Sequence, residues 1–209
     1  MFANRADAGR QLAARLEYLR PSDPVVVGLP RGGVPVAFEV ARALHAPLDV
    51  IVVRKLGVPI APEVAMGAIG EDGVRVLNDD VLRQVGVSAG ELSAVEERER
   101  AQLEAGETLL RGGRSRVELT GRVVIIVDDG IATGATARVA CLVARRLGAG
   151  RVVVAVPVAP AGAALRLGAD ELVCVLEPPQ FWAVGAHYRD FRATTDAEVV
   201  ALLAAGMVS

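Results

Sequence analysis

The sequence predicts an α/β fold, a doubly wound, mostly parallel sheet with helices on both faces. Short apolar runs rich in Val and Ile are typical of strands that are buried on both sides. These runs alternate with longer Ala-rich segments of helical length and spacing. Because parallel neighbours need a long connection between them, this alternation favours strands joined by crossover helices. Ligands bind such sheets beyond the carboxyl ends of the strands.

Proline and glycine residues set the boundaries of the expected elements. Pro24 and Pro30 bound the first apolar run, and Gly32 with Gly33 makes the turn into the helix that packs on it. In chain order, we expect a helix at about 5–19, a strand at 25–29, a helix at 34–44, strands at 49–53 and 123–127, a helix at about 134–147, a strand at 152–156, a helix at 161–167, a strand at 171–176 and a C-terminal helix at about 195–204.

The segment at about 57–121 breaks this alternation. A hairpin is expected around Glu71–Gly73, with Glu71 and Asp72 solvated at its tip. Ser88 and Glu91 form a capping-box pattern that starts a long charged helix ending near Leu110, and 111–116 should be a flexible basic loop. We interpret the whole segment as an insertion on the ligand side of one domain, residues 1–209.

Composition narrows the classes of partner. The net charge of −2 does not favour nucleic acid or an anionic membrane as a partner, and no apolar run is long enough to span a bilayer. No signal peptide is evident and the two cysteines make no disulfide framework, so we expect a cytoplasmic protein. Of the 23 basic residues only Lys55 is a lysine, which suggests a site that needs a compact ammonium group, although chance could also leave one lysine.

The most specific pattern is the segment 123–136, VVIIVDDGIATGAT. A buried strand delivers Asp128 and Asp129 to its carboxyl end, and a loop of small residues then leads into a helix. The small residues let backbone N–H groups approach a phosphate at the positive end of the helix dipole. The two carboxylates can accept hydrogen bonds from vicinal hydroxyls or hold water around a divalent cation. Phosphate, diol and metal together describe a phosphorylated sugar.

This segment resembles the motif by which type I phosphoribosyltransferases bind 5-phosphoribosyl-1-pyrophosphate (PRPP). The resemblance implies that Asp128 and Asp129 are catalytic, contacting the ribose hydroxyls and holding Mg²⁺ through water. It also implies a loop around the 5-phosphate that consists of Ala132, Thr133, Gly134, Ala135 and Thr136.

Two further segments resemble the pyrophosphate side of that family. In the loop at 28–35 the resemblance implies an unusual peptide conformation at Pro30, Arg31 and Gly32, whose backbone amides would meet the diphosphate. Arg31 offers a bidentate phosphate donor. Arg54 and Lys55 match the Arg-Lys pair that neutralises pyrophosphate in several members, with Lys55 counted among the catalytic residues. A solvated strand end is the alternative for this pair.

Two features of the sequence bear on the acceptor. Relatives that act on 6-oxopurines usually carry an Asp where this chain has Ala132, which argues against hypoxanthine or guanine. The segment at about 177–192 resembles the variable hood of the family, and its aromatic residues could stack on a flat base or pack the C-terminal helix. The candidates for base binding are Phe181, Trp182 and Val184, whereas His187 is expected to be a packing or surface residue.

The resemblance implies an enzyme of nucleotide metabolism, which transfers the phosphoribosyl group from PRPP to a nucleobase or related nitrogen heterocycle. Members often close a basic loop over the site; here Arg111, Arg114 or Arg116 would have to serve, unless this loop is merely solvated. Two alternative functions stay open: a regulator that senses PRPP without transferase activity, and a phosphosugar hydrolase or phosphorylase on the same sheet. The sequence is also compatible with a homo-oligomer.

Overall fold

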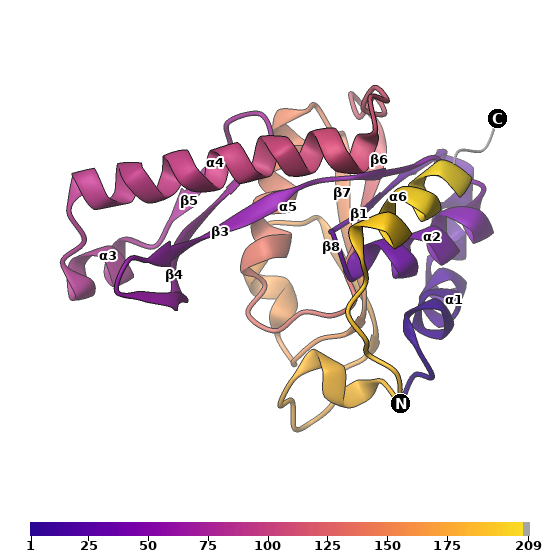
Figure 1. Ribbon diagram of the computed structural model, residues 1–209. Helices are drawn as coiled ribbons and strands as arrows, with labels where there is room; N and C mark the ends of the chain where they lie inside the picture. The colour runs from indigo at the N-terminus through magenta and orange to yellow at the C-terminus, as the bar shows by residue number, and fades with distance from the viewer. Residues whose placement is uncertain (207–209) are drawn as a thin grey trace.

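The computed structural model describes residues 1–206 and is centred on a five-stranded parallel sheet (Figure 1). The strands lie in the order β2-β1-β6-β7-β8, and every neighbouring pair is parallel. The winding reverses between β1 and β6, so this gap is the topological switch point of the sheet. The predicted fold class is confirmed. The strands are β1 (Val25–Gly28), β2 (Leu48–Val50), β6 (Val123–Val127), β7 (Arg151–Val158) and β8 (Glu171–Leu176).

Helices cover both faces of this sheet, as predicted. Alternate side chains of a strand point to opposite faces, so each buried strand supplies two cores. Val26 and Ile125 belong to the core beneath α1 and α2, whereas Val124 and Ile126 belong to the core beneath α5. Helix α6 packs beside α2 and beside the long helix α4 (Ala89–Arg111). The bounds are α1 (Arg5–Leu16), α2 (Gly33–Leu44), α5 (Ala135–Arg146) and α6 (Asp196–Ala205).

Three short 3₁₀ segments connect these elements: η1 (Glu17–Ser22), η2 (Ala163–Arg166) and η3 (Val184–His187). The helix expected at 161–167 is only the single turn η2, a correction with a clear cause. Gly162 and Gly168 both adopt positive φ, 78° and 70°, and so interrupt the helical path on either side.

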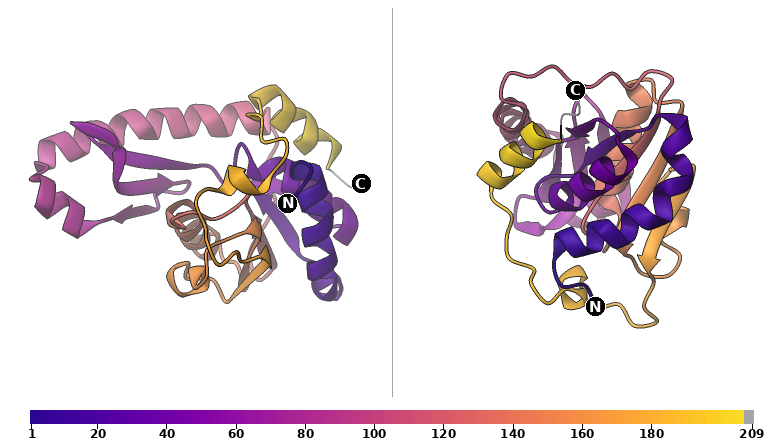
Figure 2. Two further views of the ribbon diagram at one scale, coloured as in Figure 1. Left: turned by 90° about the horizontal axis from the view of Figure 1, so that it is seen from below. Right: turned by 90° about the vertical axis from the view of Figure 1, so that its right-hand side faces the viewer.

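The inserted segment forms an arm that extends away from the parallel sheet (Figures 1 and 2). We define the arm as residues 53–111. Ser88 and Glu91 form both hydrogen bonds of the predicted capping box at the start of the long helix. The arm contains a three-stranded antiparallel sheet and two helices: β3 (Val53–Val58), β4 (Ala61–Gly70), β5 (Arg75–Leu77), α3 (Asp79–Val85) and α4 (Ala89–Arg111).

The second core strand is shorter than predicted. The apolar run expected as one strand at 49–53 is divided, because β2 ends at Val50 and Val53 already begins the arm sheet. Arg54 and Lys55 therefore lie within an arm strand and not at the end of a core strand. The hairpin around Glu71–Gly73 is present between β4 and β5, with positive φ of 56° at Asp72 and 71° at Gly73.

Two further predictions in this region are wrong. Glu71, expected to be solvated, is only 1% exposed, and Arg111 is only 8% exposed. The guanidinium of Arg111 donates to Glu71 at 2.9 Å and to Asp49 at 3.3 Å, and Arg116 pairs with Glu71 as well. Arg114 donates to the carbonyl of Arg111 at 2.8 Å. Arg111 and Arg116 therefore connect the arm to the core.

We call the four charged residues Asp49, Glu71, Arg111 and Arg116 the junction cluster. Its acids also serve the backbone: Glu71 accepts from the amide of Val52 at 2.7 Å. Asp72, by contrast, is exposed as predicted and pairs with Arg146.

Candidate active site

The acid pair, Asp128 and Asp129, follows β6 directly at the switch point of the sheet. Oδ1 of Asp128 accepts a hydrogen bond from the amide of Asp129 at 2.8 Å. Burial, reinforced by the charge of Asp129, raises the pKa of Asp128 well above its usual range. Burial also raises the pKa of Asp129, although Arg5 opposes this shift. Two adjacent, poorly solvated carboxyl groups thus lie where such sheets bind ligands.

Two residues that the sequence analysis did not assign to the acid pair hold Asp129 in place. Arg5 donates from Nε and Nη2 to its carboxylate at 2.9 and 2.8 Å, and the Tyr188 hydroxyl donates to its carbonyl at 2.6 Å. Burial raises the pKa of Tyr188, so its hydroxyl remains a donor. Arg5 lies 124 positions from Asp129 in the chain, and no local pattern signals such a contact. Tyr188 stood out in the sequence only as an aromatic of the hood.

The loop expected to hold the 5-phosphate connects β6 to the start of α5. Gly134 adopts φ of 80° and caps α5 without any side-chain hydrogen bond. The amide of Ala135 has only a long contact, 3.5 Å, to the hydroxyl of Thr133. Four residues of the loop are exposed, so its amides and hydroxyls can meet an anion at the positive end of the helix. These exposed residues are Ala132, Thr133, Ala135 and Thr136.

The loop expected on the pyrophosphate side lies across the switch point, between β1 and α2. Its Pro30–Arg31 peptide bond is cis, the kind of unusual conformation that the resemblance implies. Gly32 lies against the acid pair, since a Cβ at this position would be 2.1 Å from Oδ2 of Asp129. Arg31 is more than half exposed, 3.8 Å from the carboxylate of Asp196. The structure therefore brings this loop together with the acid pair.

The Arg54–Lys55 pair is divided by the arm. Neighbouring residues of a strand point to opposite faces, and Arg54 pairs with Glu99 of α4 at 3.0 Å. Lys55 has Ala68 as its cross-strand partner, which belongs to the core beneath α5, and its ammonium donates to the carbonyl of Glu63 at 3.0 Å. Lys55 is thus on the face turned toward α5, whereas Arg54 is on the face turned toward α4. The two residues matched to the Arg-Lys pair of the family therefore do not point to the same side of the strand.

The hood returns to the same region after β8. Val184 packs against the residue that follows the acid pair: a Cβ at Gly130 would be 2.5 Å from a Val184 methyl. Phe181 stacks on His187 with ring centroids 5.8 Å apart, which agrees with a packing role for that histidine. Trp182 is 86% exposed. Of the three candidates for base binding, Val184 is beside the acid pair, and the roles of all three stay predictions.

The donors available to a metal are few. Among residues 1–206, no group of three or more His, Cys, Asp or Glu side chains is placed to hold a metal ion. Two carboxylates nevertheless suit Mg²⁺, which usually binds one or two of them and completes its shell with water and substrate phosphates.

Along residues 1–206, no helix has the length and apolar character needed to cross a membrane.

Comparison with known proteins places the chain in a family. The Phosphoribosyl transferase domain model matches residues 3–190, so the chain belongs to the phosphoribosyltransferase family. Two Mycobacterium tuberculosis proteins, from strains CDC 1551 / Oshkosh and H37Rv, carry provisional names as phosphoribosyl transferases. Each is 58% identical over 205 residues, 97% of this chain but 46% of the relative. The chain thus spans about half the length of these curated relatives.

A solved structure is similar over the whole fold. The crystal structure of TT1426 from Thermus thermophilus has 46% sequence identity and a TM-score of 0.82, and the match covers 97% of each chain. This likeness extends over both the parallel sheet and the arm, so the arm is shared with that protein.

Proposed function

We propose that this protein binds PRPP with Mg²⁺ and transfers its 5-phosphoribosyl group to a nitrogen heterocycle, releasing pyrophosphate. One observation carries the proposal: the acid pair lies between two loops that suit phosphate groups, one after β1 and one after β6. PRPP has the matching order, with a phosphate at one end, a diol in the middle and a diphosphate at the other end.

We assign a set of residues to each part of PRPP. The loop Ala132–Thr136 would bind the 5-phosphate through backbone amides and the hydroxyls of Thr133 and Thr136. The acid pair would accept hydrogen bonds from the ribose hydroxyls. Arg31 and Lys55, with the amides of the cis-peptide loop, would meet the diphosphate.

The acid pair would also hold Mg²⁺ through water, and bound Mg²⁺ would neutralise part of the charge on the diphosphate. This assignment fits the donor set, because among the described side chains the two acids form an ion pair with one arginine, Arg5. The metal would reach the site with PRPP, since the described residues offer no complete shell of their own.

The reaction forms a bond between the acceptor nitrogen and C1 of the ribose, and breaks the bond between C1 and the diphosphate oxygen. The electron pair of the broken bond leaves with pyrophosphate, and the nitrogen releases its proton to solvent. Little covalent work falls to the protein, which must orient the two substrates, neutralise the leaving group and exclude water.

The acceptor would lie under the hood, beside Val184. Phe181 and Trp182 could contribute stacking surface. Ala132 cannot exchange a proton with a purine, which favours acceptors other than 6-oxopurines.

Calorimetry with PRPP and Mg²⁺ tests the donor site. We expect wild type to bind and Asp129→Asn to bind at least about a hundredfold more weakly, since it loses a charged acceptor that touches ligand and metal water. The matched control is Asp23→Asn, an 83% exposed acid at the opposite end of the sheet, which should bind like wild type. Equal affinity of Asp129→Asn and wild type would refute the donor site.

A screen for pyrophosphate release with a panel of bases then tests the transfer. Release that depends on one base identifies the acceptor. Tight PRPP binding without release for any base would contradict the transferase assignment and favour a PRPP sensor.

A further inference from the structure

The ion pair between Arg5 and Asp129 is not among the contacts that the proposed function assigns to PRPP. Both donors of Arg5 reach the same carboxylate oxygen, Oδ2, at 2.9 and 2.8 Å. Among the side chains that the structure describes, no other residue donates a hydrogen bond to the second oxygen, Oδ1. Asp129 is thus pinned by one oxygen and keeps the second one for another partner.

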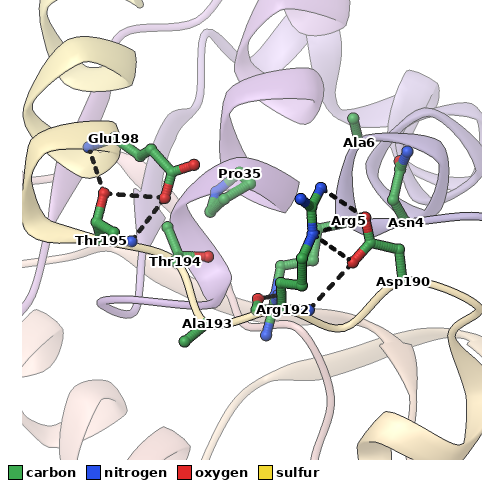
Figure 3. Close-up of a pocket in the computed structure, with 10 residues that line it drawn as sticks. All are labelled: Asn4, Arg5, Ala6, Pro35, Asp190, Arg192, Ala193, Thr194, Thr195 and Glu198. Carbon is green, nitrogen blue, oxygen red and sulfur yellow. Dashed lines mark hydrogen bonds and ion pairs between the residues drawn. The ribbon is translucent and has the colours of Figure 1, made fainter.

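Arg5 is itself held from three sides. Its Nη1 donates to the carbonyl of Arg192 at 2.7 Å, and its guanidinium lies 4.0 Å from the centre of the Phe191 ring, a cation–π contact. With Asp129 as the third anchor, the side chain is only 11% exposed. Arg5 also borders a cavity of about 350 Å³ between the start of α1 and the segment that leads into α6 (Figure 3). The Arg5 side chain is therefore held in one place beside Asp129.

The backbone around Arg5 is tied to the hood. The amide of Phe2 donates to the carbonyl of His187 at 2.8 Å, and the amide of Arg189 donates to the carbonyl of Phe2 at 2.9 Å. The rings of Phe2 and Tyr188 pack with centroids 5.3 Å apart. Since Tyr188 also donates to the carbonyl of Asp129, the N-terminal segment and the hood converge on one residue.

We propose that Arg5 is a positioning residue of the acid pair, which together with Tyr188 fixes Asp129 so that Oδ1 faces the ribose diol and the metal-bound water of PRPP. This inference rests on the proposed function. Gly32 supports it, because a Cβ there would lie 2.1 Å from Oδ2 and 3.2 Å from Nε of Arg5. The ion pair is thus the surface on which the pyrophosphate-side loop rests.

The opposite role, a guanidinium that blocks the carboxylate until ligand displaces it, fits the contacts less well. Displacement would break the bond to the Arg192 carbonyl and the contact with Phe191 as well as the ion pair. A fixed Arg5 instead leaves Oδ1 available without any rearrangement. The two roles predict opposite effects on affinity when the guanidinium is removed.

The test measures the affinity for PRPP and Mg²⁺ by calorimetry in Arg5→Met, Arg5→Lys and a matched control. We expect Arg5→Met to bind about tenfold more weakly, as when a supporting partner of a ligating group is lost. Arg5→Lys should recover part of the loss, because an ammonium keeps the charge but not the fork of donors. The control, Arg10→Met, removes a 55% exposed arginine of the same helix and should bind like wild type.

A double-mutant cycle with Asp129→Asn separates positioning from a general structural effect. If Arg5 acts through Asp129, adding Arg5→Met to Asp129→Asn costs no further affinity. Losses that multiply, or Arg5→Met binding as well as or more tightly than wild type, would overturn the proposal. If Asp129→Asn binds too weakly to measure, added guanidinium chloride decides: it should restore affinity to Arg5→Ala but leave the Arg10→Ala protein unchanged, and no restoration would overturn the proposal. Failure of wild type to bind PRPP would instead remove the proposed function itself.

Discussion

Two clusters of carboxylates in this molecule differ in how fully their charge is balanced. The acid pair at the end of β6 faces one arginine, Arg5. The junction cluster between core and arm sets two acids against two arginines and also binds backbone amides. Both clusters are poorly exposed, so the difference between them is the balance of charge and not the degree of burial.

This difference in charge balance distinguishes the junction cluster, which stabilises the fold, from the acid pair, which we propose binds a ligand. In the junction cluster, burial acts to lower the pKa of Arg111, but Glu71 and Asp49 outweigh it and raise that pKa, so the cation persists. In the acid pair, burial and the neighbouring charge of Asp129 raise the pKa of Asp128. A buried acid without a full counter-charge is costly, which is why such groups are functional-site candidates.

The largest effect, on the stability of the fold, is expected from removing a cation of the junction cluster. Arg111→Met removes the cation that joins Glu71 and Asp49 and leaves both acids short of a partner. We expect the free energy of unfolding to fall by roughly 3–5 kcal/mol, the usual loss when one partner of a buried ion pair is removed. Urea denaturation, followed by far-UV circular dichroism, measures the change.

The control for this substitution is Arg98→Met in the same helix. Arg98 is 61% exposed, and its partner Glu99 keeps Arg54 as a second cation, so the loss of Arg98 should cost less than about 1 kcal/mol. Equal effects of the two substitutions would mean that the junction cluster is no more than a surface ion pair.

An intermediate effect, on the affinity for PRPP, is expected from substituting Lys55 and Arg54, which point to opposite faces of β3. Lys55→Met should weaken binding of PRPP by about tenfold, the size of one charge-assisted hydrogen bond. Arg54→Met should change affinity less than about twofold, because Arg54 is engaged with Glu99 as a partly exposed ion pair. Calorimetry on both variants checks the order. A larger loss for Arg54→Met would place the pyrophosphate on the α4 side of β3.

Local signals explain what could be predicted from the sequence. The Val- and Ile-rich runs at β1, β6, β7 and β8 identify strands because each run lies between turn residues. The acid pair and the loop of small residues follow β6 directly, so strand, acids and helix start are read from one continuous segment. The capping box of α4 is equally local.

Contacts between distant segments could not be predicted in the same way. Arg5 reads as an ordinary residue in the first turn of a helix, and its partner lies 124 positions away. Glu71 reads as an exposed hairpin tip, and only the return of α4 places Arg111 against it. The apolar run at 49–53 does not reveal that the chain changes sheets after Val50. Each of these features depends on packing between elements and not on the residues of one element.

The smallest effect is expected from neutralising one member of the acid pair. The folded pKa of Asp128 lies above the value of about 3.9 for an unfolded aspartate. As the pH rises, the unfolded chain releases this proton first, so the acid destabilises the fold increasingly until the pH exceeds the folded pKa. Asp128→Asn should therefore be more stable than wild type by about 1 kcal/mol near pH 8, with the gain shrinking toward pH 4.

Thermal unfolding without ligand at several pH values measures this gain, with Asp129→Asn as the matched comparison. Asp129→Asn leaves Arg5 with a neutral partner and should bring no stabilisation. Lower stability of Asp128→Asn at pH 8 would show that the Asp128 carboxylate is already compensated within the protein. If only Asp128→Asn is more stable than wild type, the charged Asp128 carboxylate lowers the stability of the ligand-free protein, and bound ligand would offset this loss.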